Sequence, residues 1–132
     1  MRILLDTNVL FWTARGELDK LSEKTLELLQ NPANELYVSI CSIWEIEMKH
    51  LKKPELMPVS GKEIYDSLIN TNATILGIEF EYVNSLKTIF DEKIHGDPFD
   101  QIIMATALCE DLYLLSSDEM IAKYQNIRTM QC

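Results

Sequence analysis

The sequence is short of the residues on which several protein classes depend. Only 3 cysteines and 2 histidines occur among its 132 residues. Cys41, Cys109 and Cys132 are odd in number and lack the spacing of a disulfide framework or a metal site, which favours reduced thiols in a cytoplasmic protein. We expect Cys41 and Cys109 to be core residues.

Long apolar runs are also absent. The first run, residues 3–5, is interrupted by Asp6, so the sequence predicts no signal peptide, and no later run is long enough to span a bilayer. Hydrophobic residues still make up 47% of the chain, which is enough for the core of one globular domain. We therefore predict a single domain over residues 1–132.

Positive charge is scarce, because 12 lysines and arginines stand against 21 acidic residues and give a net charge of −9. Affinity for a nucleic-acid backbone comes mainly from lysine and arginine, so tight passive binding to nucleic acid is disfavoured. Where negative charges cluster, a divalent metal or a basic partner protein is needed to compensate them.

Short apolar runs alternate with helical patterns along the chain. Runs rich in Ile and Leu are typical of parallel strands that are buried on both faces. The expected strands are residues 2–6, 36–40, 73–78, 112–116 and 127–130, and the expected helices are residues 18–29, 43–51, 62–69, 82–90 and 98–110. This alternation predicts an α/β fold, a three-layer α/β/α sandwich with a central, mainly parallel sheet.

Four acidic residues follow the expected strands or begin the helices after them. Asp6 comes directly after the first strand and Asp118 shortly after the fourth, whereas Glu45 and Asp100 lie in the first turns of helices. Ligands of open parallel sheets bind beyond the carboxyl ends of the strands, where the strand order reverses, so we expect these carboxylates to converge there. Carboxylate oxygens favour Mg²⁺ or Mn²⁺ over Zn²⁺, and such a metal suits the hydrolysis of phosphodiesters.

Helix capping is the alternative interpretation of each acidic residue. Ser42 and Glu45 have the S-x-x-E form of a capping box. Ser60 and Glu63 have the same form but follow a proline-containing loop, so we interpret that pair as structural. Capping alone would not bring all the acidic residues to one edge of the sheet.

The acidic pair beside Pro98 divides between the two roles. Proline suits the first helical position, which makes Asp97 the N-cap and Asp100 the third helical residue. We therefore assign Asp97 mainly to capping and Asp100 to the site.

Four segments carry a resemblance to a known family. They are LLDTNVLFW at residues 4–12, SIWEIEMK at 42–49, HGDPFDQIIMATAL at 95–108 and LLSSDEMI at 114–121. In this order and spacing they resemble the four motifs of the PIN-domain ribonucleases, and among these the VapC-type toxins of type II toxin–antitoxin systems. The resemblance covers essentially the whole chain and implies a PIN-like fold.

The resemblance implies a Mg²⁺-dependent endoribonuclease, in which Mn²⁺ can replace Mg²⁺, with products ending in 5′-phosphate and 3′-hydroxyl. The catalytic and metal-binding residues that it implies are Asp6, Glu45, Asp100 and Asp118, with Asp97, Ser116 and Asn8 as secondary residues. The implied partners are an RNA substrate and a small antitoxin that can place a basic side chain in the acidic pocket. The implied assembly is a homodimer or a toxin–antitoxin hetero-oligomer.

Few positive charges are available to contact RNA. Gln101 departs from the family pattern, because relatives with the DPFD segment commonly have arginine there, and this leaves the substrate contact at that position open. Lys49, Lys52 and Lys53 form a basic run after Glu45. The run reflects either the preference for cations at helix C-termini or a role in steering phosphates.

The histidines and large aromatic residues receive structural interpretations. No nucleophile-elbow pattern accompanies His50 or His95, so both are expected at the surface or in loops. Phe11, Trp12 and Trp44 are expected in the core, since platforms for base stacking usually have basic neighbours.

Two other functions remain open. A degenerate PIN domain would bind RNA or a partner without catalysis. A receiver-like signalling domain would also hold Mg²⁺ at the ends of parallel strands, but it needs a phosphoacceptor aspartate after a central third strand, and residues 73–78 do not end in one.

Overall fold

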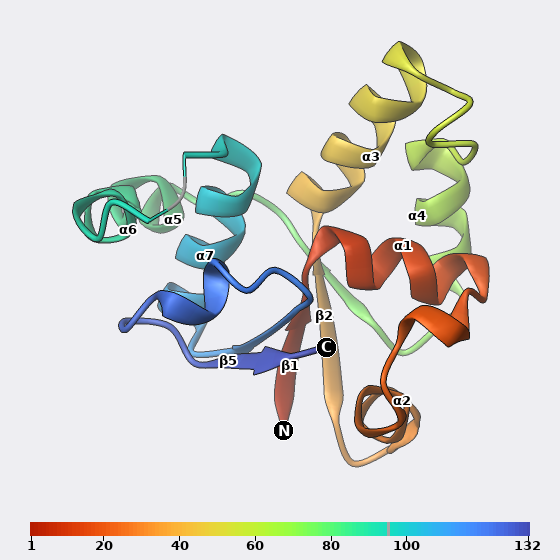
Figure 1. The fold of residues 1–132 in the computed structure, drawn as a ribbon, viewed down its shortest axis with the longest axis horizontal. Helices are drawn as coiled ribbons and strands as arrows, with labels where there is room; N and C mark the ends of the chain where they lie inside the picture. The colour runs from red at the N-terminus through yellow and green to blue at the C-terminus, as the bar shows by residue number, and fades with distance from the viewer. Residues whose placement is uncertain (95) are drawn as a thin grey trace.

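The computed structural model describes residues 1–94 and 96–132. Its centre is one sheet of parallel strands in the order β3-β2-β1-β4-β5 (Figure 1). The strands are β1 Arg2–Leu5, β2 Glu35–Ser39, β3 Thr74–Leu76, β4 Tyr113–Ser116 and β5 Thr129–Gln131. Helices cover both faces of the sheet, so the predicted three-layer α/β/α fold is confirmed.

The helices lie in two groups on opposite sides of the sheet, apart from α3. Those of the described residues are α1 Thr7–Arg15, α2 Glu23–Gln30, α3 Ile40–Lys52, α4 Gly61–Ile69, α5 Phe80–Asn84, α6 Leu86–Asp91 and α7 Pro98–Glu110, with short 3₁₀ turns η1 Leu18–Lys20 and η2 Ile121–Lys123. In Figure 1, α5, α6 and α7 lie on one side of the sheet and α1, α2 and α4 on the other. Helix α3 extends beyond the strand ends and packs on α1, α4 and α7.

Strand β1 shows why the sheet is buried on both faces. Ile3 and Leu5 point into the core beneath α1, α3 and α4, whereas Leu4 points into the core beneath α7. Successive side chains of a strand point to opposite faces, so a strand covered on both sides is apolar throughout. This arrangement places the end of β1 in the middle of the molecule.

Two of the expected helices are interrupted in the structure. Residues 18–29 form η1 and then α2, because the Ser22 hydroxyl accepts a hydrogen bond from the Thr25 backbone N–H at 3.1 Å and starts a new helix. Residues 82–90 form α5 and α6, which meet at Ser85. Helix α1, which the sequence patterns did not single out, ends at Gly16 in the left-handed conformation (φ 69°).

Helix α7 has the predicted bounds and is largely buried, but its cysteine corrects one expectation. Cys109 is exposed rather than in the core, whereas Cys41 is buried as expected. Among the described residues, no helix combines the length and the apolar character that crossing a membrane requires.

Candidate active site

The strand order reverses between β1 and β4, and a buried carboxylate lies at this point. Asp6 follows β1 directly, and its backbone N–H donates to the carbonyl oxygen of Leu115 at 3.0 Å. The Ser116 hydroxyl at the end of β4 donates to Asp6 Oδ2 at 2.6 Å. The Asp6 residue is only 4% exposed. This reversal is the position at which open parallel sheets bind their ligands.

Asp6 also begins helix α1. Its Oδ1 accepts a hydrogen bond from the Thr7 backbone N–H at 2.8 Å. Burial raises the pKa of the Asp6 carboxyl, the hydrogen bonds from Ser116 and Thr7 lower it, and the charges of Glu45 and Asp118 raise it further. Asp6 therefore caps helix α1 and also lies near the negative charges of Glu45 and Asp118.

Glu45 lies in the second turn of α3, not the first. The helix begins at Ile40, and the hydroxyl of Ser39, its N-cap, accepts from the Cys41 backbone N–H at 3.0 Å. The alternative interpretation of Ser42 and Glu45 as a capping box is therefore wrong, because β2 continues into α3 without a loop and the N-cap lies three residues earlier, at Ser39. Glu45 is 7% exposed and does not cap a helix.

Thr7 holds the Glu45 side chain from the neighbouring helix. Its Oγ1 donates to Glu45 Oε1 at 2.8 Å and lies 3.1 Å from the hydroxyl of Ser42, which is fully buried. The sequence patterns did not assign Thr7 to the site. The one feature of the sequence that could have indicated Thr7 is its position directly after Asp6, the residue that follows the first strand. Asn8, the expected secondary residue beside it, is exposed on α1.

Lys49 supplies a positive charge at this edge. Its Nζ lies 2.9 Å from Glu45 Oε2, one helical turn away on α3. Lys52 and Lys53 are exposed at the far end of the same helix. Of the basic run, Lys49 is thus the residue that contacts an acidic candidate.

The two aspartates at the start of α7 have separate positions. Asp97 is the N-cap, and its Oδ1 accepts from the backbone N–H groups of Phe99 at 2.8 Å and Asp100 at 3.4 Å. Asp100 lies in the first turn and is half-buried. Both charges act on the buried thiol of Cys41 in α3. Burial raises the pKa of this thiol to about 12, with further contributions from Glu45, Asp100 and Asp97.

Asp118 lies in the loop after β4. Its backbone N–H donates to Ser116 Oγ at 3.0 Å, and its Oδ1 accepts from the Met120 backbone N–H at 2.8 Å. The Ser116 hydroxyl therefore connects the Asp118 backbone with the Asp6 side chain.

The carboxylates interact at one edge of the sheet without forming a closed metal-binding group. Asp6 interacts electrostatically with Glu45 and Asp118, and the Cys41 thiol interacts with the acids of α3 and α7. Within residues 1–94 and 96–132, no three acidic, histidine or cysteine side chains are grouped closely enough to hold one ion. The available donors are carboxylate and hydroxyl oxygens, which match the preference of a hard cation.

The remaining candidates lie elsewhere or differ from expectation. His50 Nδ1 lies 2.8 Å from the carbonyl oxygen of Met57, and His95 lies outside the described residues. Phe11 and Trp12 pack partly buried against the core. The prediction that Trp44 lies in the core is wrong, because this residue is 54% exposed, and its ring contacts Phe99, which packs against the core.

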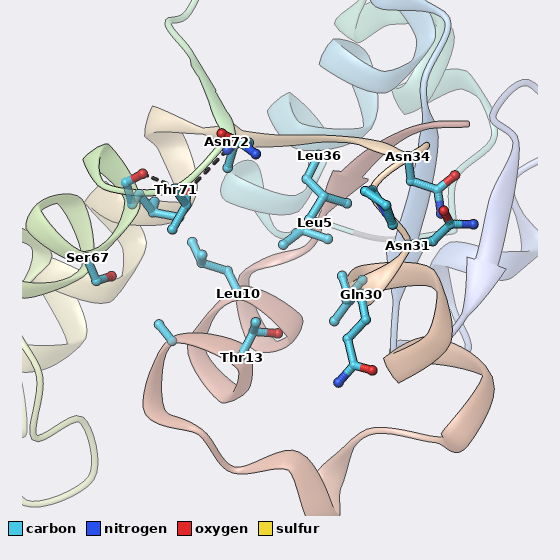
Figure 2. A pocket seen from close by; sticks show the side chains of 15 residues that line it. Leu5, Leu10, Thr13, Gln30, Asn31, Asn34, Leu36, Ser67, Thr71 and Asn72 are labelled. Carbon is cyan, nitrogen blue, oxygen red and sulfur yellow. Dashed lines mark hydrogen bonds between the residues drawn. The ribbon is translucent and has the colours of Figure 1, made fainter.

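A hollow of about 570 Å³ between α1, α2 and α4 is separate from the acidic edge (Figure 2). Its apolar floor includes Leu5, Leu10 and Leu36. Amide side chains line the rim, among them Gln30, Asn31, Asn34 and Asn72. None of the acidic candidates lines this hollow, so its size does not make it the active site.

Comparison with known proteins identifies the family. The PIN domain family matches residues 3–127. The chain belongs to this family. The fold is similar to crystal structures of VapBC2 from Rickettsia felis bound to a promoter DNA fragment (TM-score 0.71) and of DNA-bound VapBC from Salmonella typhimurium (TM-score 0.70). In both, the identity is 17%, with 99% of this PIN domain chain and 98% of the other chain covered.

A third similar structure is that of a toxin with a known RNA target. It is VapC20 of Mycobacterium tuberculosis, described as a sarcin–ricin loop cleaving toxin, with a TM-score of 0.60 and 12% identity over 96% of this chain and 98% of that chain. No curated protein matches the sequence. The structural comparisons show that this PIN domain has the fold of VapC chains.

Proposed function

We propose that this PIN domain is a metal-dependent endoribonuclease that acts as the VapC-type toxin of a type II toxin–antitoxin system. The observation that supports the proposal most is the buried Asp6 at the reversal of strand order, held by Ser116 and facing the charges of Glu45 and Asp118. Repulsion among these charges disfavours the ionised form of Asp6 unless a cation compensates it.

Asp6, Asp100 and Asp118 would hold Mg²⁺ or Mn²⁺, and Glu45 would bind a second ion or orient the attacking water. When bound, the metal supplies activation of water and stabilisation of charge on the phosphate and the leaving oxygen. Ser116 would fix the orientation of the Asp6 carboxylate, and Thr7 that of Glu45, through the hydrogen bonds described above. The carboxylates would have to come closer together than they are among the described residues to hold one ion.

A cleavage assay tests the proposal. Purified protein incubated with RNA and Mg²⁺ is expected to release fragments, and Asp100→Asn or excess chelator is expected to abolish the release. Asp66→Asn changes an exposed carboxylate of α4 that pairs with Lys62 and should leave cleavage intact. Cleavage that persists in chelator or with Asp100→Asn would contradict the proposal.

The proposed partner is a small antitoxin with a basic segment. The acidic edge and the net charge of −9 favour association with a positively charged chain. Co-expression with the product of a neighbouring small gene should give a stable complex that inhibits cleavage, and a toxic chain without such a neighbour would contradict this part.

The alternative functions have less support. In a receiver-like domain the third strand would be central, but β3 lies at the edge of this sheet. A degenerate PIN domain would have lost acidic residues, but this chain retains all four. We propose that the protein cleaves RNA in the cytoplasm. Its proposed assembly is a homodimer or a complex with the antitoxin.

A further inference from the structure

An aromatic pair joins α3 and α7 at the surface beside the acidic residues. The ring centroids of Trp44 and Phe99 lie 4.9 Å apart with the ring planes at 80°, which is an edge-to-face contact. Phe99 is half-buried, whereas Trp44 is among the exposed large side chains. The contact with Phe99 therefore leaves more than half of the Trp44 surface for another ligand.

Each ring stands one residue before a carboxylate of the candidate site. Trp44 precedes Glu45, and Phe99 precedes Asp100. The thiol of Cys41, one turn before Glu45, lies 3.9 Å from the carbonyl oxygen of Phe99 and interacts with the charges of Glu45 and Asp100. The aromatic pair and the acidic edge are thus parts of one junction between α3 and α7.

Trp44 also borders a shallow hollow between α3 and α4. Its volume is about 370 Å³, and Ile40, Ile43 and Tyr65 line it with Trp44. The two helices approach closely, because a Cβ atom on Gly61 would lie only 3.2 Å from the carbonyl oxygen of Ile43. Glu47 and Lys62 also line the hollow, so the exposed indole has both apolar and charged neighbours there.

Charge gives this protein little affinity for RNA. Lys49, the cation on the Trp44 helix closest to Glu45, is paired with that acid, and the net charge of the chain is −9. Stacking of bases on an aromatic ring adds affinity that does not depend on the net charge, although such rings usually have basic neighbours, and it requires a base that is not enclosed in a duplex. Lys49 and Lys62 are basic residues near Trp44.

We infer that Trp44, supported by Phe99, binds an unpaired base of the RNA substrate by stacking, beside the phosphate that enters the acidic edge. The inference rests on the proposed nuclease function and adds to it a residue that contacts an unpaired base. Trp44 is then a substrate-binding residue outside the carboxylate set.

Tryptophan fluorescence tests the contact directly. The chain has two tryptophans, so Trp12→Phe leaves Trp44 as the only indole. In a protein that also carries Asp100→Asn to prevent cleavage, a short single-stranded RNA is expected to quench the emission of Trp44. A blunt duplex of the same sequence, and the single strand made abasic, are expected to quench it much less.

Variants of Trp44 test the contribution to binding. Trp44→Ala should weaken binding of the single strand about 5- to 100-fold and raise KM for cleavage by a similar factor while kcat changes little. Trp44→Phe retains a ring and should recover most of the affinity. Phe80→Ala removes an exposed ring from α5 and should change neither value.

These experiments distinguish a failure of the Trp44 inference from a failure of the nuclease proposal. Unaltered binding by a folded Trp44→Ala protein, or an unquenched indole at saturating RNA, would overturn the inference. A change of Trp44 emission with protein concentration in the absence of RNA would overturn it in favour of a protein contact. Absence of cleavage by the unmodified protein would contradict the nuclease proposal instead, and RNA binding would still decide whether Trp44 stacks on bases.

Discussion

The S-x-x-E segments of α3 and α4 have the same form and opposite roles. The Ser60 hydroxyl at the start of α4 accepts from the Glu63 backbone N–H at 3.1 Å and lies 3.3 Å from Glu63 Oε1, on the exposed surface. Ser42 is fully buried within α3, and Glu45 receives its hydrogen bond from Thr7 of another helix. The local pattern therefore does not decide whether the acid caps a helix.

The connection before each helix explains the difference. Strand β2 ends at Ser39, which is itself the N-cap of α3, so this helix starts at the edge of the sheet. Helix α4 instead follows the loop that contains Pro58. Burial of an ionised carboxylate is unfavourable unless it is compensated, and Glu45 is compensated by Lys49 and Thr7. The chain thus holds this buried acid in place at the edge of the sheet near Asp6, which supports a functional role for it rather than for the exposed Glu63.

The largest expected effect distinguishes the two glutamates. Glu45→Gln should reduce RNA cleavage about 10²- to 10⁴-fold, because a group that orients or activates water is lost. Glu63→Gln is the matched variant and should leave the cleavage rate unchanged. Initial rates with Mg²⁺ measure both, and equal rates for the two variants would remove the functional difference between the segments.

A smaller effect is expected for the hydroxyl that holds Glu45. Thr7→Val removes the donor to Glu45 Oε1 but keeps the shape of the side chain, and cleavage should fall about 10-fold or more because the carboxylate loses its orientation. Thr7→Ser restores the hydroxyl and should restore most of the activity. Full activity of Thr7→Val would show that the hydrogen bond does not position Glu45.

The smallest effect concerns stability. In metal-free protein, Asp6→Asn should increase the free energy of unfolding at neutral pH by about 0.5–2 kcal/mol, because it removes a buried charge whose pKa is raised by desolvation. The increase should accompany a loss of cleavage. Urea denaturation in chelator measures it, and Asp19→Asn, an exposed change of the same kind in η1, should have no such effect.

The pH dependence gives the sign of this contribution. Folding raises the Asp6 pKa above its ordinary value of 3.8. At a pH between the pKa of the unfolded chain and the raised pKa of the folded state, the folded state holds more protons than the unfolded chain. The free energy of unfolding consequently falls as the pH rises through this window. The gain from Asp6→Asn should be full above the raised pKa and should disappear below the ordinary value. A gain that grows at acid pH would contradict this explanation.

The sequence predicted the parts of the fold that depend on apolar runs and proline. Strands buried on both faces are recognisable because both sets of alternating side chains are apolar, and Pro98 marks the start of α7. The interruptions at Ser22 and Ser85 were missed, because apolar spacing continues across a local cap.

The positions of the candidate acidic residues in the fold were predictable, but their function stays a prediction. The order of strands and acids placed Asp6 beyond β1, but the contacts of its neighbours depend on packing between helices. Thr7 meets Glu45 only because α1 packs on α3, and no spacing in the sequence reports that contact. The exposure of Trp44 was also missed, because a large aromatic residue is usually buried.

The hydrogen bond from Ser116 to Asp6 joins residues 110 positions apart. Asp6 is synthesised before its partner Ser116 and the strand β4 that carries it, which follow more than 100 residues later. An unfinished or truncated chain therefore contains the first carboxylate without the strand and hydroxyl that orient it. The hydrogen bond that orients Asp6 therefore cannot form until β4 has been synthesised.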